Sequence, residues 1–135
     1  MNGFLMLEKS FVLGEEFFAE SYAPENNYGV VFEDDGDTAY FYAVEKERNR
    51  EIPQILDALH IYESGSFLAE KRPSKLVIVW STDWQKSALV LDGLCHAVFD
   101  FFKQAGYNIN RFPPPNEFWT KADRKLTNEL IAELF

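Results

Sequence analysis

Short runs of alternating apolar and polar residues extend along most of the chain, and the same turn sequence interrupts two of them. The first turn, Asp35-Gly36, lies within residues 28–44, and the second, Asp92-Gly93, lies within residues 86–101. Asp-Gly between β-rich runs is typical of a two-residue type I′ hairpin, in which both central residues have positive φ. The pattern therefore predicts two antiparallel hairpins.

A two-residue turn also fixes which side chains share a face of the hairpin. In the first hairpin it sets Asp34 opposite Asp37 and puts Tyr40 and Tyr42 on a half-wet face. The other face is apolar and holds Tyr28, Val30, Phe32, Ala39, Phe41 and Ala43. This division predicts one face toward the core and one toward solvent.

The second hairpin is apolar on both faces. Its register sets Val90 opposite Cys95 and Leu89 opposite His96, with Asp100 on the same face as His96. Strands that are apolar on both faces are typical of the centre of a covered sheet. We therefore expect this hairpin to be central.

Further elements complete an α+β prediction. Residues 75–81 are β-branched and apolar, and residues 10–13 and 16–21 also favour strands. Apolar residues recur at helical spacing over 52–62, behind Pro53, and over 120–134, behind a Thr120–Asp123 capping sequence. The expected fold is one domain, 1–135, with an antiparallel sheet of about five to seven strands and two helices.

Charge is concentrated at one end of the chain. Residues 1–37 carry nine acidic residues and one basic residue, whereas the net charge of all 135 residues is −9. Such a field repels phosphate backbones and anionic membranes, so we expect no nucleic-acid or membrane partner. A charged partner would be basic.

The lone cysteine, Cys95, excludes an intramolecular disulfide and is typical of a reducing compartment. The chain starts without a basic leader, and none of its runs approaches the ~20 apolar residues of a membrane span. These features favour a cytoplasmic location.

Candidate chemistry is sparse. Tyr40, Tyr42, His96 and Asp100 could line a ligand pocket if their faces converged, although His96 and Asp100 are about 13 Å apart along a strand at ~3.3 Å per residue. Cys95 beside His96 is no nucleophile–base dyad, because neighbouring strand residues point to opposite faces. The sequence has no metal-ligand spacing and no motif that indicates a cofactor.

The acidic turn at 33–37 suggests a cation site, but it lacks EF-hand spacing, and a solvated turn is the simpler interpretation. A contact surface is the second candidate. Trp and Arg are enriched at interface hot spots, and extended proline runs pack on aromatic rings. The residues concerned are Trp80, Trp84, Arg111 and Trp119, with prolines 113–115.

Several runs together resemble a small bacterial family known as a conserved domain of unknown function. They are residues 27–36, 55–62, 75–81, 96–101 and 112–115. The resemblance covers roughly residues 14–118 and leaves the predicted C-terminal helix outside. It implies a bacterial cytosolic protein and brings no activity or catalytic residue with it.

Two hypotheses follow. The first is a non-catalytic binding or accessory protein that acts through protein contacts, immunity- or antitoxin-like in one version, with a basic protein or a second copy as partner. The second is a small enzyme or ligand binder with a pocket over the Tyr40/Tyr42/His96/Asp100 face. The missing catalytic motifs favour the first hypothesis.

Overall fold

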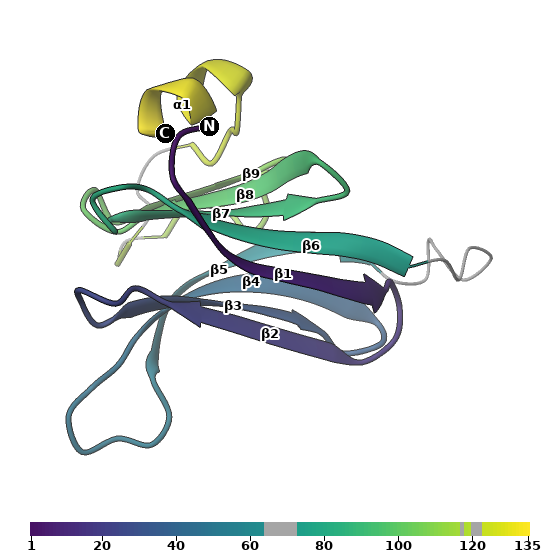
Figure 1. Ribbon diagram of the computed structural model, residues 1–135, viewed down its shortest axis with the longest axis horizontal. Coiled ribbons are helices and arrows are strands. Elements are labelled where there is room, and N and C mark those ends of the chain that lie inside the picture. Colours follow the sequence, from purple (N-terminus) through teal and green to yellow (C-terminus); the bar gives the residue numbers. More distant parts are fainter. Residues whose placement is uncertain (64–72, 117, 120–122) are drawn as a thin grey trace.

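The chain folds into two antiparallel β-sheets that pack face to face (Figure 1). The structure is a computed structural model that describes residues 1–63, 73–116, 118–119 and 123–135. These residues form nine strands and one helix: β1 (Phe4–Val12), β2 (Phe17–Tyr22), β3 (Tyr28–Asp34), β4 (Thr38–Glu45), β5 (Gln54–Glu63), β6 (Pro73–Trp80), β7 (Lys86–Leu91), β8 (Leu94–Asp100), β9 (Ala105–Asn108) and α1 (Asn128–Leu134).

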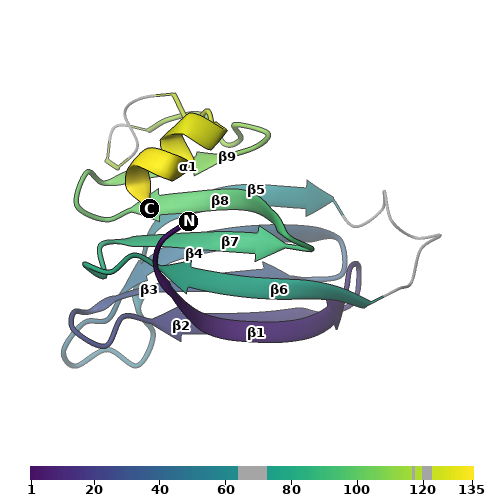
Figure 2. The same cartoon turned by 45° about the horizontal axis from the view of Figure 1, so that its top comes forward.

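The two sheets are formed by different stretches of the chain: β1 and β6 to β9 belong to one sheet, and β2 to β5 belong to the other. After β1, strands β2 to β5 form a four-stranded sheet in sequence order, and the chain then returns to the first sheet. There β6 pairs with β1, and the strand order is β1-β6-β7-β8-β9 (Figure 2). The predicted antiparallel β-structure is confirmed, but the described residues form nine strands in two sheets, where we expected about five to seven in one sheet.

Large aromatic side chains fill the space between the sheets. Phe41 of the four-stranded sheet stacks on Phe99 of the five-stranded sheet, with ring centroids 5.2 Å apart. Trp80 is fully buried, and its indole N–H donates to the Ser21 hydroxyl across the sandwich at 2.9 Å. Each buried ring removes a large apolar area from water. Among the described residues, five phenylalanines are buried in this core: Phe11, Phe32, Phe41, Phe99 and Phe101.

The first hairpin has the predicted faces with a different turn. Asp35 N–H donates to the Thr38 carbonyl, and φ is positive at Gly36 (95°) but not at Asp37, which is typical of a type II′ turn. The turn is therefore Gly36-Asp37, one residue later than predicted. The pairing moves by two residues, so Asp34 lies opposite Ala39, and the predicted pair Asp34–Asp37 is wrong. A two-residue shift preserves the faces.

The second hairpin has the predicted turn with a different pairing beyond it. Asp92 and Gly93 both have positive φ, 48° and 83°, as a type I′ turn requires, and Val90 lies opposite Cys95. Leu89, however, lies opposite Ala97, so His96 is an extra residue in β8. This β-bulge reverses the face assignment of the rest of the strand.

The helix predicted over 52–62 is wrong, because these residues form most of β5. Leu59 and Ile61 are buried against the core on one face, whereas Ala58 and His60 on the other face are half-buried. The apolar residues recur at helical spacing, but residues 54–63 pair with β4, and this pairing makes the segment a strand.

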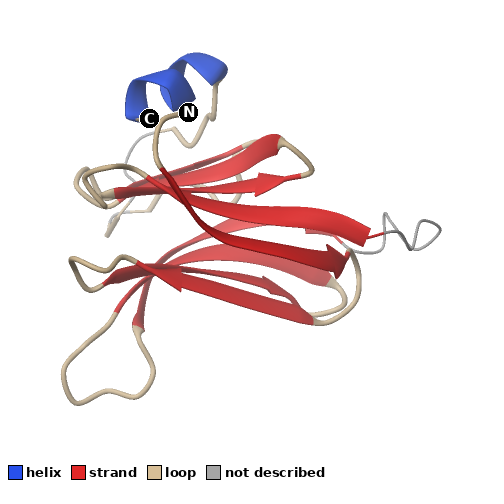
Figure 3. Ribbon diagram, viewed as in Figure 1, coloured by secondary structure: helices blue, strands red, loops and turns tan. Residues whose placement is uncertain are grey.

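The C-terminal helix is shorter than the predicted 120–134. Its first residues, 120–122, lie outside the described residues, and Lys125 still forms an extended bridge with Asn108. The Thr127 hydroxyl then accepts a hydrogen bond from Leu130 N–H at 3.1 Å and caps α1. The helix packs Leu134 against Ala88 and Val98, on the outer face of the five-stranded sheet (Figure 3).

Candidate functional site

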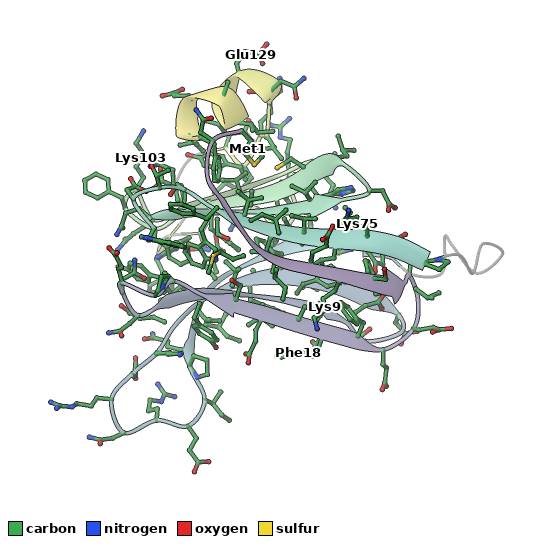
Figure 4. The ribbon with its side chains drawn as sticks, viewed as in Figure 1. Met1, Lys9, Phe18, Lys75, Lys103 and Glu129 are labelled. Atoms are coloured by element: carbon green, nitrogen blue, oxygen red, sulfur yellow. The ribbon has the colours of Figure 1, made fainter. Side chains whose placement is uncertain are left out.

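The outer faces of the two sheets are covered differently. Helix α1 lies over the five-stranded sheet, whereas no helix of the described residues lies over the outer face of the four-stranded sheet (Figure 1). Phe18 projects from that uncovered side, and Met1, Lys103 and Glu129 lie toward the opposite side of the molecule (Figure 4). The uncovered side is therefore a candidate surface for a partner.

Strand register places the outward side chains of this sheet in rows. Phe18 lies opposite Glu33, which lies opposite Tyr40, and Glu20 lies in the same way beside Val31 and Tyr42. We call this surface the open face. It is defined by Phe18, Glu20 and Tyr22 of β2, Val31 and Glu33 of β3, and Tyr40, Tyr42 and Val44 of β4.

A shallow groove of about 270 Å³ runs along the open face. Val31 and Val44 are buried in its floor, and Phe18, which is 57% exposed, stands at its side. Ile52 and Ile55, at the end of the 46–53 loop, add apolar side chains that are 77% and 61% exposed. Exposed apolar side chains gathered in one place are typical of contact surfaces rather than of ordinary solvent-facing strands.

Carboxylates border this groove. Glu20 and Glu33 line it directly, and a neighbouring hollow of about 390 Å³ adds Glu16 and Asp35. All four side chains are exposed. The open face thus combines an apolar floor with an anionic border, and much of the acidic charge of residues 1–37 is located here.

Two tyrosines of the open face, Tyr22 and Tyr42, have raised pKa values. Burial raises the pKa of Tyr42, and the nearby Glu33 carboxylate raises it further. Burial likewise raises the pKa of Tyr22, together with the neighbouring Glu20. Both shifts favour the uncharged phenol, so these two rings are neutral π surfaces beside the carboxylates of the face.

His60, rather than His96, joins the predicted tyrosines. The His60 ring makes edge contacts with Tyr40 (centroids 5.3 Å apart) and Phe112 (5.9 Å). The Asn110 amide nitrogen lies 2.6 Å from His60 Nδ1 and donates to it when Nε2 holds the proton. Pattern reasoning missed His60 because it placed residues 52–62 on a helix.

The predicted Tyr40/Tyr42/His96/Asp100 pocket is not formed. Tyr40 and Tyr42 stack on the outer face of the four-stranded sheet, with centroids 5.9 Å apart. His96 and Asp100 belong to β8 of the other sheet, where Asp100 is fully buried and accepts from Lys103 N–H. The core separates the two pairs, because each sheet presents a different side to solvent.

Burial disfavours the thiolate form of Cys95. Burial raises its pKa to about 11, so the nucleophilic thiolate is scarce at neutral pH. It packs beside the cluster under α1. The bulge at His96 interrupts the strand alternation that predicted no Cys95–His96 dyad, and the absence of this dyad stays a prediction that the raised pKa of the thiol supports.

The predicted contact tryptophans are mostly structural. Trp80 is fully buried and Trp119 is 8% exposed, so neither is available for a partner. Trp84 is half-buried and stacks on Phe4 at 4.9 Å. Arg111 is exposed but forms a bidentate ion pair with Asp123 at 2.7 and 3.0 Å.

In the acidic turn, Glu33, Asp35 and Asp37 are exposed, and only Asp34 is withdrawn from solvent. Asp34 is buried and accepts hydrogen bonds from Tyr62 OH (2.6 Å), Gly14 N–H and Gly36 N–H. Asp35 accepts from the backbone of Asp37 and Thr38. The carboxylates of this turn thus organise the loop, and the described residues contain no cluster of three His, Cys, Asp or Glu suited to a metal ion.

A buried ion pair was not foreseen from the sequence. The Arg124 guanidinium binds both carboxylate oxygens of Asp57, at 2.7 and 2.9 Å, with both side chains almost fully buried. Gly106 makes room for this pair, since a Cβ at that position would lie 2.9 Å from Asp57. Sixty-seven residues separate the partners, so no local pattern could indicate the contact.

The sequence of the chain matches a known protein family. A model described as an uncharacterized protein conserved in bacteria, DUF2251, matches residues 11–135. The chain belongs to the DUF2251 family. The match confirms the resemblance seen in the sequence and extends it through α1, which that resemblance had left outside.

A curated relative of this DUF2251 protein supports the assignment. An uncharacterized protein of Haemophilus influenzae (strain ATCC 51907 / DSM 11121 / KW20 / Rd) is 38% identical over 105 residues, which is 76% of this chain. The match spans 63% of the relative's own length. No solved structure matches the chain. None of the described helices is long and apolar enough to cross a membrane.

Proposed function

We propose that this DUF2251 protein is a non-catalytic binding protein that takes up a basic segment of a partner protein on its open face. The observation that carries the proposal is the uncovered, apolar and carboxylate-bordered groove of the four-stranded sheet. Its apolar floor gains from losing contact with water, and its carboxylates select for positive charge.

The location of charge favours a basic protein over a second copy of this chain. Two open faces brought together would bring the Glu20 and Glu33 carboxylates of both copies into one interface. Like charges that meet at an interface oppose association. A homodimer through this face is therefore the weaker alternative, and an immunity- or antitoxin-like role would be one form of the stronger one.

The proposal can be tested by an NMR titration at low ionic strength. The probe is an end-blocked peptide of alternating lysine and valine, compared with its glutamate–valine counterpart. Amide shifts are expected to concentrate on β2, β3 and β4 with the lysine peptide alone. Shifts that concentrate around α1, or equal binding of the glutamate peptide, would contradict the proposal.

A pair of matched charge variants sharpens the test. Glu20→Gln with Glu33→Gln removes two charges from the open face, and Glu129→Gln with Glu133→Gln removes two from α1. Exposed ion pairs contribute about 0.2–1 kcal/mol, so the first pair should weaken binding about 1.5- to 5-fold per carboxylate. Equal weakening by the α1 pair would show that net charge alone, and not the open face, attracts the peptide.

A further inference from the structure

One aromatic ring at the border of the open face already holds a cation. The Nζ atom of Lys46 lies 4.1 Å from the ring centroid of Tyr22. The hydroxyl of the same tyrosine donates to Glu20 Oε2 at 3.4 Å. A neutral ring with an adjacent carboxylate is a suitable environment for a primary ammonium group, because both attract positive charge.

A glycine on the neighbouring strand makes room for the Tyr22 ring. Tyr22 lies opposite Gly29 in the β2–β3 pair, and a Cβ at Gly29 would lie 2.3 Å from the tyrosine ring. The ring therefore occupies the space that a side chain at position 29 would need. Lys46 directly follows β4, two strands away from β2, and its N–H donates to the Asn27 carbonyl at 2.8 Å.

Lys46 is held weakly at this place. Its side chain is exposed, and within the described residues no ion pair holds its ammonium group. The hollow around it, about 480 Å³ in volume, shares Glu20, Tyr22 and Pro53 with the groove of the open face. A lysine from outside could therefore reach the same ring by continuing along the groove.

We propose that Tyr22 and Glu20 form a lysine-ammonium subsite of the open face, which Lys46 occupies in the free protein and vacates when a partner's lysine binds. This inference rests on the proposed function and names the chemical group that the face recognises. It also gives Lys46 a role as an internal competitor that keeps the subsite filled.

The variant Lys46→Met tests the competition, because methionine retains an apolar stem and loses the charge. Lys103→Met is the matched control, with the same charge change on the opposite side of the molecule (Figure 4). In the full chain, Lys46→Met should bind the lysine–valine peptide about two- to fivefold more tightly than Lys103→Met, the range expected for an exposed cation–π contact.

A second readout follows Lys46 itself. The ring current of Tyr22 should shift the Hε resonances of Lys46 upfield in the free protein. Saturation with the lysine–valine peptide should return them to the position of a solvated lysine, and the same peptide with acetylated lysines should leave them unchanged.

The outcomes separate the two proposals. Peptide binding to β2–β4 with unmoved Lys46 resonances, and with equal affinity for both lysine variants, would overturn the subsite and leave the proposed function standing. Absence of binding to the parent protein and to both variants would overturn the proposed function and the subsite together.

Discussion

At the scale of single residues, His96 occupies an unusual position. It is the extra residue of the bulge in β8, and its carbonyl accepts a hydrogen bond from Ile109 N–H at 3.2 Å. Burial lowers the pKa of its imidazole below the ordinary 6.5, and the nearby Asp92 only partly opposes this effect. The folded protein therefore favours the neutral ring more strongly than the unfolded chain does.

This shift predicts a specific pH dependence of stability. Below about pH 6.5 the unfolded chain binds a proton at His96 more readily than the folded chain, so the free energy of unfolding falls as the pH falls. The contribution is fully present above pH 6.5. His96→Gln should remove this dependence, so urea denaturation of the parent and variant should give a free-energy difference that is constant above pH 7 and changes between pH 6.5 and 5. A constant difference throughout would contradict the assignment.

Several of the most informative residues could not be predicted individually. Asp34, Asp57 and Asn108 are polar and buried, and each bonds to a residue 28 to 67 positions away, in Tyr62, Arg124 and His60 respectively. A local pattern assigns such residues to solvent, because only the fold supplies their partners. Tyr40 and Tyr42, by contrast, were placed on the correct face by alternation alone.

At the scale of elements, the two hairpins show that the type of turn and the pairing of the strands beyond it depend on different residues. The Asp92-Gly93 turn follows from its dipeptide, because both residues tolerate positive φ. The first hairpin has the same dipeptide, but its Asp35 side chain accepts two backbone N–H groups and the turn moves on by one residue. The bulge at His96 has no signature in the sequence, and this is why the faces of β8 were assigned wrongly.

The type I′ turn predicts that a substitution at Gly93 changes stability almost entirely through the backbone conformation. A Cβ added there would meet nothing within 4 Å, so Gly93→Ala changes the cost of the left-handed backbone and little else. We expect a loss of about 1–2 kcal/mol in the free energy of unfolding. Gly93→Asn, which tolerates this conformation better, should lose less. Chemical denaturation of both variants checks the order, and equal losses would mean that the turn type is wrong.

At the scale of the whole molecule, the segment before α1 is joined to the far sheet by the buried ion pair. Arg124 belongs to the stretch that pairs with Asn108 of β9, and Asp57 belongs to β5 of the four-stranded sheet, so the ion pair connects the two sheets at this edge. The guanidinium also donates to the Gly106 carbonyl at 3.3 Å. This arrangement fixes how the C-terminal segment lies on the sandwich.

Loss of one member of this pair should be costly. Arg124→Met leaves the Asp57 carboxylate buried without its guanidinium, which typically costs about 3–5 kcal/mol. The double variant Asp57→Asn with Arg124→Met removes both charges, so its loss should be clearly smaller than the sum of the two single losses. Urea denaturation of the three variants provides the measurement, and additive losses would contradict a coupled pair.

The overall charge distribution was the most useful prediction about the surface. The acidic residues of 1–37 were visible in the sequence, and the fold gathers Glu16, Glu20, Glu33 and Asp35 along one sheet. Their position beside an apolar groove could not be foreseen, because it depends on which sheet α1 covers.

The ends of the chain provide a practical consequence of this asymmetry. Asn2 N–H donates to the Phe135 carbonyl at 3.4 Å, so the two termini are neighbours beside α1 (Figure 1). A tether, dye or fused domain attached at either end would therefore extend from the side opposite the open face. Immobilisation on a sensor surface through either terminus would present the same uncovered sheet to the solution, so a captured protein layer would have a uniform orientation without further engineering.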